Sequence, residues 1–148
     1  MTYNNIASAY REASARGSHP VTLVVKLYDA ILQDFRRAAL ALDSGDVEAR
    51  TSCLNHALKI IAELQGTLDF DRGGEVAQRL NSFYDVTRPL VIEANAWASA
   101  KQIQKLIDLY LPLRQAWRQV EEEVLGIRGT EMQHGAPATR ESTVGQTA

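Results

Sequence analysis

Apolar residues along the first third of the chain recur in alternating steps of three and four, which is the spacing of one face of an α-helix. The helix is predicted to begin at Pro20, because a proline at the first helical position lacks only an amide that would have no partner there. It is predicted to end at the stretch DSGD, where Gly45 suits a left-handed terminal residue and Asp46 suits a cap for the next helix. The residues of this apolar series are Val24, Leu27, Tyr28, Ile31, Phe35, Ala38 and Leu42.

Three further series with the same spacing predict three more helices. The second series ends near Leu68, before two adjacent glycines at 73–74. The third resumes after the glycines, and the fourth opens at Ser99 and closes at Gly126. Ser99 and Gln102 have the form of a capping box, in which each side chain bonds the backbone amide of the other residue.

The four predicted helices have similar lengths of about 24 to 27 residues, or roughly 36 to 40 Å. Similar helices joined by short turns are typical of an antiparallel up-down bundle. The sequence therefore predicts an all-α four-helix bundle over residues 18–126. Residues 1–17 are predicted to add a short N-terminal helical segment, and residues 127–148 a disordered C-terminal tail. Pro89 and Pro112 lie within two of the helices and are expected to bend them.

Composition and charge narrow the possible functions. The chain has 148 residues, 45% of them hydrophobic, which is enough for one domain with a buried core. A net charge of -2 and a pI of about 5.9 give no basic field for nucleic acid. The N-terminus has no long apolar stretch, so neither a signal peptide nor a membrane anchor is predicted. The single cysteine, Cys53, fits a reducing compartment, and we expect a cytoplasmic protein without membrane insertion.

The glycine pair raises the question of a phosphate-binding loop. A Walker loop requires Lys-Ser/Thr after its glycines, and a dinucleotide loop requires a preceding strand. Here Glu75 and Val76 follow the glycines, and the preceding element is a predicted helix. A carboxylate in the first helical turn would also repel a phosphate bound there. We therefore predict a structural corner at 69–74 and no nucleotide site.

Candidate catalytic and metal-binding residues are few. Di-metal bundles draw a Glu-x-x-His pair from each of two helices, whereas the chain has one such pair, Glu131 with His134, in the predicted tail. Cys53 and His56 offer two ligands where zinc takes four, so we interpret Cys53 as a small core residue and His56 as a surface polar group. No nucleophile is matched to a base at a recognisable spacing, although spacing does not exclude a pair formed in three dimensions. The sequence predicts no enzyme, no metal and no cofactor.

The first long helix has a wide apolar surface. At about 100° per residue its apolar side chains cover roughly 220°, whereas a bundle helix needs a stripe of about 100°. One interpretation is a more enclosed helix, covered for instance by the N-terminal segment. The other is a groove that receives an amphipathic helix of another chain. Leu27 and Ile31 lie near the middle of the arc, where core residues are expected. The edge of the arc holds the better candidates for partner contact, namely Val21, Val25, Tyr28 and Leu32.

Several short motifs, taken in order, resemble a known family. Tyr10 and Pro20 come first, and LYDAIL, HALKIIAELQGTLDFDRGGEVAQRL, EAN and LRQAW follow. Each motif alone carries little information, but the ordered set is specific. It is similar to the flagellin-specific export chaperones of bacterial flagellar systems over about residues 6–118.

This resemblance implies a binding protein without catalysis. It would hold the C-terminal segment of flagellin, prevent polymerisation in the cytosol and help present the segment to the export gate. The resemblance also implies a functional tyrosine near the N-terminus, so Ile6 and Tyr10 are expected to belong to a movable cover over the groove. Asn55 and Lys59 match family positions suited to holding a bound chain, although a solvated helix face explains them equally well. A bundle adaptor or secretion chaperone for another subunit is the alternative function.

Overall fold

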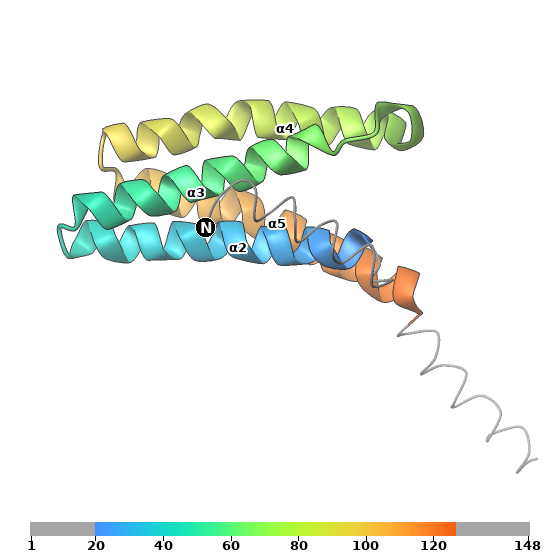
Figure 1. Ribbon diagram of the computed structural model, residues 1–148, viewed down its shortest axis with the longest axis horizontal. Coiled ribbons are helices and arrows are strands. Elements are labelled where there is room, and N and C mark those ends of the chain that lie inside the picture. The colour runs from blue at the N-terminus through green and yellow to red at the C-terminus, as the bar shows by residue number, and fades with distance from the viewer. Residues whose placement is uncertain (1–19, 127–148) are drawn as a thin grey trace, which may run out of the picture.

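The computed structural model describes residues 20–126 as four α-helices. They are α2 (Pro20–Asp43), α3 (Val47–Gly66), α4 (Phe70–Ala96) and α5 (Ala100–Leu125), as Figure 1 shows. The predicted N-terminal cover, with Ile6 and Tyr10, and the predicted C-terminal tail lie outside the described residues.

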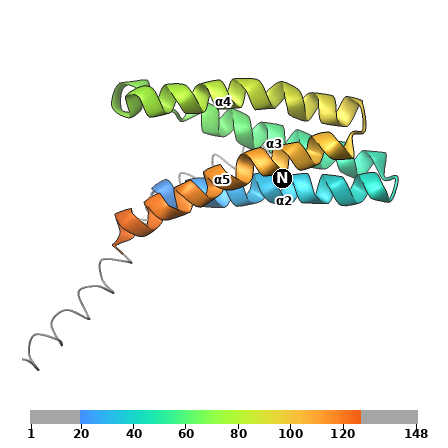
Figure 2. The same ribbon diagram turned by 180° about the vertical axis from the view of Figure 1, so that it is seen from behind.

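The helices form an up-down bundle in which each helix packs against two others. α2 contacts α3 and α5, and α4 likewise contacts α3 and α5. Short turns at 44–46, 67–69 and 97–99 join successive helices. Figures 1 and 2 show α4 stacked over α3, while α5 runs from the end of α4 across to α2. The predicted all-α four-helix bundle is confirmed, and its first and last described helices lie side by side.

Apolar side chains from all four helices fill the bundle interior. The ring of Phe35 on α2 meets the edge of the Tyr110 ring on α5, with centroids 5.5 Å apart and planes at 75°, a favourable aromatic geometry. Fully burying one large apolar side chain contributes roughly 1.5 to 3 kcal/mol. The largest fully buried residues are Tyr28, Tyr84, Tyr110, Phe35, Ile31, Leu32, Leu54, Ile60, Ile61, Ile103, Leu106 and Val91.

The ends of the helices follow the sequence signals, with one difference. Gly45 has a φ of 76°, and the Asp46 carboxylate accepts a hydrogen bond from the Ala49 N–H at 3.0 Å. Ser99 Oγ accepts from the Gln102 N–H at 3.1 Å, but the reciprocal bond of the capping box does not form. The Gln102 amide instead donates to the backbone carbonyl of Leu90 at 3.3 Å. Gln102 therefore ties the start of α5 to α4 rather than to its own cap.

One helix differs from its predicted length. α3 has 20 residues and ends at Gly66 rather than near Leu68, because the Thr67 hydroxyl donates to the Leu64 carbonyl and closes the last turn. Both Pro89 and Pro112 lie inside helices, and the helical assignment of α4 and α5 continues through them.

The helix α4 begins earlier than predicted, before the glycine pair. Asp69 caps α4 by accepting from the backbone N–H groups of Asp71 and Arg72, so one helical turn precedes the break. Gly74 then has φ 50° and ψ -123°, a conformation that L side chains rarely adopt, and the helix resumes after it. The corner is a break within α4 rather than a loop before it.

Replacing Gly73 or Gly74 by alanine is expected to lower the free energy of unfolding by about 1 kcal/mol each. Gly74 would strain at its positive φ, and a Cβ on Gly73 would lie 2.9 Å from the Cβ of Ala77. Gly66→Ala is the matched control, since Gly66 ends α3 with open space around it and no positive φ. Urea unfolding of the three variants measures the difference. Wild-type stability in both corner variants would show that the corner tolerates a side chain.

Candidate partner-binding surface

A polar groove runs between α2 and α3. It has a volume of about 470 Å³. The predicted contact residues Asn55 and Lys59 are exposed and line this groove from α3, with Gln33 and Arg37 facing them from α2. The groove therefore brings together two of the predicted site residues. Its lining residues are Ala30, Gln33, Asp34, Arg37, Ser52, Cys53, Asn55, His56 and Lys59.

A partly buried hydrogen bond joins the two walls of this groove. The Nδ1 atom of His56 lies 2.6 Å from Oδ2 of Asp34. Burial raises the pKa of the Asp34 carboxyl, and the hydrogen bond and charge of His56 oppose that rise. The other ring nitrogen of His56, Nε2, is buried without a hydrogen-bond partner. The interpretation of His56 as a surface polar group is therefore wrong, because its imidazole bonds a buried carboxylate of the neighbouring helix.

The predicted edge residues of α2 are all buried. Val21 and Val25 are 5% exposed, Leu32 is 2% exposed and Tyr28 is fully buried. Leu27, predicted near the middle of the arc, is partly buried and packs against the core. Ile31, the other residue predicted near the middle, is fully buried, so edge and middle do not separate into exposed and buried residues.

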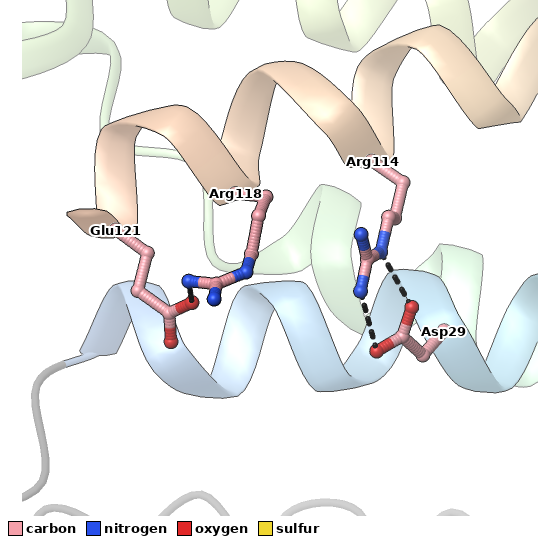
Figure 3. Close-up of polar contacts among 4 residues, drawn as sticks. All are labelled: Asp29, Arg114, Arg118 and Glu121. Atoms are coloured by element: carbon pink, nitrogen blue, oxygen red, sulfur yellow. Dashed lines mark hydrogen bonds and ion pairs between the residues drawn. The ribbon is translucent and has the colours of Figure 1, made fainter.

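The helix α5 contributes to this burial, because it packs against α2 and its Tyr110 ring lies 5.9 Å from the ring of Tyr28. Figure 3 shows Asp29 on α2 facing Arg114 on α5, and the Arg114 Nε atom donates to Oδ1 of Asp29 at 2.7 Å. Asp29 follows Val25 by four residues and precedes Leu32 by three, so the three side chains lie on one side of α2. We call this contact the α2–α5 seam.

The seam continues toward the end of α5. Arg118 donates to the carboxylate of Glu121 at 2.8 Å, and both side chains extend over the start of α2 in Figure 3. Glu121 is buried, and Arg118 is the ion-pair partner of its carboxylate. Sequence periodicity alone does not show that α5 returns to α2, although the resemblance motif LRQAW contains the arginine at 114 that makes the contact.

Two hydroxyl pairs cross the apolar interior. The hydroxyl groups of Tyr28 and Tyr84 lie 2.6 Å apart, and the Thr87 hydroxyl lies 2.7 Å from that of Tyr110. Burial raises the pKa of each of the three tyrosines above its ordinary value. These pairs link α2 to α4 and α4 to α5, so Tyr28 has an interior partner.

An apolar cavity opens beside the glycine corner. It has a volume of about 240 Å³ and is lined by residues from all four helices. Val76 on its wall is largely exposed, whereas Tyr84 is buried at its floor. Sequence analysis missed this cavity, because its walls come from helix ends that meet only in the folded bundle. The apolar lining residues are Val24, Leu64, Leu68, Val76, Ala77, Leu80, Tyr84 and Trp117.

The described residues hold neither a cluster of metal ligands nor a membrane-spanning helix. Across residues 20–126, no three histidine, cysteine or acidic residues gather closely enough to hold a metal ion. Within the same part of the chain, no helix has the length and hydropathy required to cross a membrane. The polar groove and the apolar cavity are two of the hollows on the described bundle.

Comparisons with known proteins identify the family. Residues 2–124 match the family described as flagellar protein FliS. The chain is 35% identical over 118 residues to the flagellar secretion chaperone FliS of Campylobacter jejuni, covering 79% of this chain and 92% of that protein. It is 32% identical over 110 residues to the flagellar secretion chaperone FliS of Salmonella typhimurium, covering 74% and 82%. A flagellar secretion chaperone FliS of Bacillus subtilis is 29% identical over 119 residues, covering 80% and 88%.

The chain therefore belongs to the FliS family of flagellar secretion chaperones. The family predicted from the ordered motifs is confirmed, and so is the role of a flagellar export chaperone.

Proposed function

We propose that this chaperone binds the amphipathic C-terminal segment of flagellin in the cytoplasm and prevents its premature polymerisation. In this proposal it also assists delivery of flagellin to the flagellar export gate, and it acts without catalysis or a cofactor. The observation that carries the proposal is the apolar cavity of about 240 Å³ between the four helices. An amphipathic helix could insert an apolar side chain there and shield its own apolar face. Polymerisation of a filament subunit uses that same face.

The proposed contacts differ in how they reach the partner. Asn55 and Lys59 are exposed beside the polar groove and contact the bound segment directly in this proposal. Leu27, which is partly buried on α2, is proposed to contact it as well. The buried edge residues act indirectly, because their packing against α5 fixes the position of α2. Ile6 and Tyr10 remain in the proposal as parts of a cover that competes with flagellin for the groove. The buried edge residues are Val21, Val25, Tyr28 and Leu32.

Calorimetry with a peptide covering the C-terminus of flagellin from the same cell tests this function. Replacing Asn55 or Lys59 by alanine is expected to weaken binding by about 1 kcal/mol each, since each removes polar contacts to the bound chain. Lys105→Ala is the matched control, because Lys105 is an exposed lysine on α5, on a different hollow. Circular dichroism confirms that each variant keeps its helices.

Two outcomes would contradict different parts of the proposal. No binding heat from the wild-type chain with any flagellin of its own cell would exclude flagellin as the partner and favour another secreted subunit. Wild-type affinity in both the Asn55 and the Lys59 variants would exclude the polar groove as the contact surface.

A further inference from the structure

The turn between α4 and α5 presents an exposed aromatic side chain. Trp97 is 80% exposed, more than any other large apolar residue in the exposed set of residues 20–126. It terminates α4, and its backbone N–H donates to the Glu93 carbonyl at 2.9 Å. Tryptophan is enriched among residues that dominate binding energy in interfaces. Trp97 lines neither the polar groove nor the apolar cavity proposed for flagellin, so that function does not explain its exposure.

The backbone that carries Trp97 is fixed on the α3 side. The Asn95 side chain accepts hydrogen bonds from Arg50 Nε at 3.0 Å and from the Thr51 hydroxyl at 3.1 Å. A second Arg50 nitrogen donates to the Asn95 backbone carbonyl at 3.2 Å. Ala98 adopts a φ of 49°, the one positive φ of a non-glycine residue in residues 20–126. These contacts hold the turn in one conformation, in which the Trp97 side chain faces solvent instead of packing against the bundle.

A small hollow adjoins the indole ring. It has a volume of about 220 Å³ and is lined by Glu93, Trp97, Ser99 and Gln102. Glu93 precedes Trp97 by one helical turn, so both side chains project from the same face of α4. Small-molecule sites have volumes of about 300 Å³ or more, so this hollow suits one side chain better than a cofactor.

The hollow carries an unneutralised negative charge. The Glu93 carboxylate accepts one bond, from the Gln102 amide at 3.3 Å. None of the ion pairs found within residues 20–126 involves Glu93. A carboxylate beside an exposed indole face is therefore available to a cation.

We propose that this corner binds an arginine side chain presented by another protein. A guanidinium group is planar, so it can stack on the Trp97 indole while its N–H groups donate to the Glu93 carboxylate. The two contacts reinforce each other, because both favour the same positive charge. Lys101 and Lys105 line the adjacent hollow on α5, so a basic segment would approach from the α4 side. The partner is thus a protein with an exposed basic segment.

Nuclear magnetic resonance of the full ¹⁵N-labelled chain tests the proposal. The chain has two tryptophans, so the indole N–H signal of Trp97 is the reporter and that of Trp117 is the internal control. The probes are blocked tripeptides Gly-Arg-Gly and Gly-citrulline-Gly, which differ in charge but hardly in shape. The arginine peptide is expected to shift the Trp97 signal saturably, and the citrulline peptide is not.

Two variants distinguish a specific contact with the Glu93 carboxylate from a general effect of the protein's negative charge. Glu93→Gln is expected to weaken arginine binding by up to about fivefold, from loss of the exposed ion pair. Glu123→Gln, which removes an exposed carboxylate at the far end of the bundle, is expected to leave the affinity unchanged. Equal shifts with the citrulline peptide, equal affinity in the Glu93 variant, or no saturable shift would each overturn the proposal.

Discussion

Replacing Leu32 by aspartate is expected to abolish cooperative folding. Removing a buried leucine costs about 2 to 5 kcal/mol, and placing an unpaired carboxylate in its site costs several more. Together these costs approach the total stability of a typical domain, about 5 to 15 kcal/mol. Leu32 is 2% exposed, so no solvent relieves the charge. Circular dichroism during thermal unfolding measures the loss.

The matched control is Leu40→Asp on the same helix. Leu40 is 69% exposed, so this change is expected to alter the free energy of unfolding by less than about 0.5 kcal/mol. A Leu32 variant that unfolds with the wild-type midpoint would mean that its side chain reaches solvent. In that case the edge of α2 would be open to a partner rather than closed by the α2–α5 seam.

Replacing Tyr28 by phenylalanine is expected to lower the free energy of unfolding by about 1 to 3 kcal/mol, because the buried Tyr84 hydroxyl loses its hydrogen-bond partner. The reverse change, Tyr84→Phe, is expected to have a cost of the same order, because the buried Tyr28 hydroxyl then loses the same hydrogen bond. The double variant is expected to cost less than the sum of the single ones, because it leaves neither hydroxyl unpaired. Urea unfolding of the four proteins gives this double-mutant cycle. Strictly additive single effects would contradict a direct bond between the hydroxyls.

The helices could be predicted because their signals are local. Spacing of apolar residues, together with Pro20, Asp46, Ser99 and Gly126, places the starts and ends of three helices within a few residues of those observed. The fold class follows, since four helices with short turns have few ways to bury their apolar faces. Gly74 was harder to interpret, because a glycine pair also suits a loop, and only the Asp69 cap shows that α4 begins before the break.

The candidate site depends on contacts between helices, which one helix's periodicity does not reveal. A wide apolar arc on α2 has the same pattern whether a partner or α5 covers its edge. The burial of Val25 and the pairing of Asp29 with Arg114 follow from the return of α5 to α2. The bond between His56 and Asp34 likewise depends on the relative positions of α2 and α3. Asn55 and Lys59 were accessible to sequence reasoning only through family resemblance.

The side-by-side packing of α2 and α5 has a consequence for synthesis on the ribosome. Asp29 and Arg114 are 85 residues apart in the chain, so at 5 to 20 residues per second the second arrives roughly 4 to 17 seconds after the first. During that interval the α5-facing side of α2 has no native cover. A nascent chain of this chaperone therefore passes through a stage in which its own apolar edge is open to the same premature association that it is proposed to prevent in flagellin.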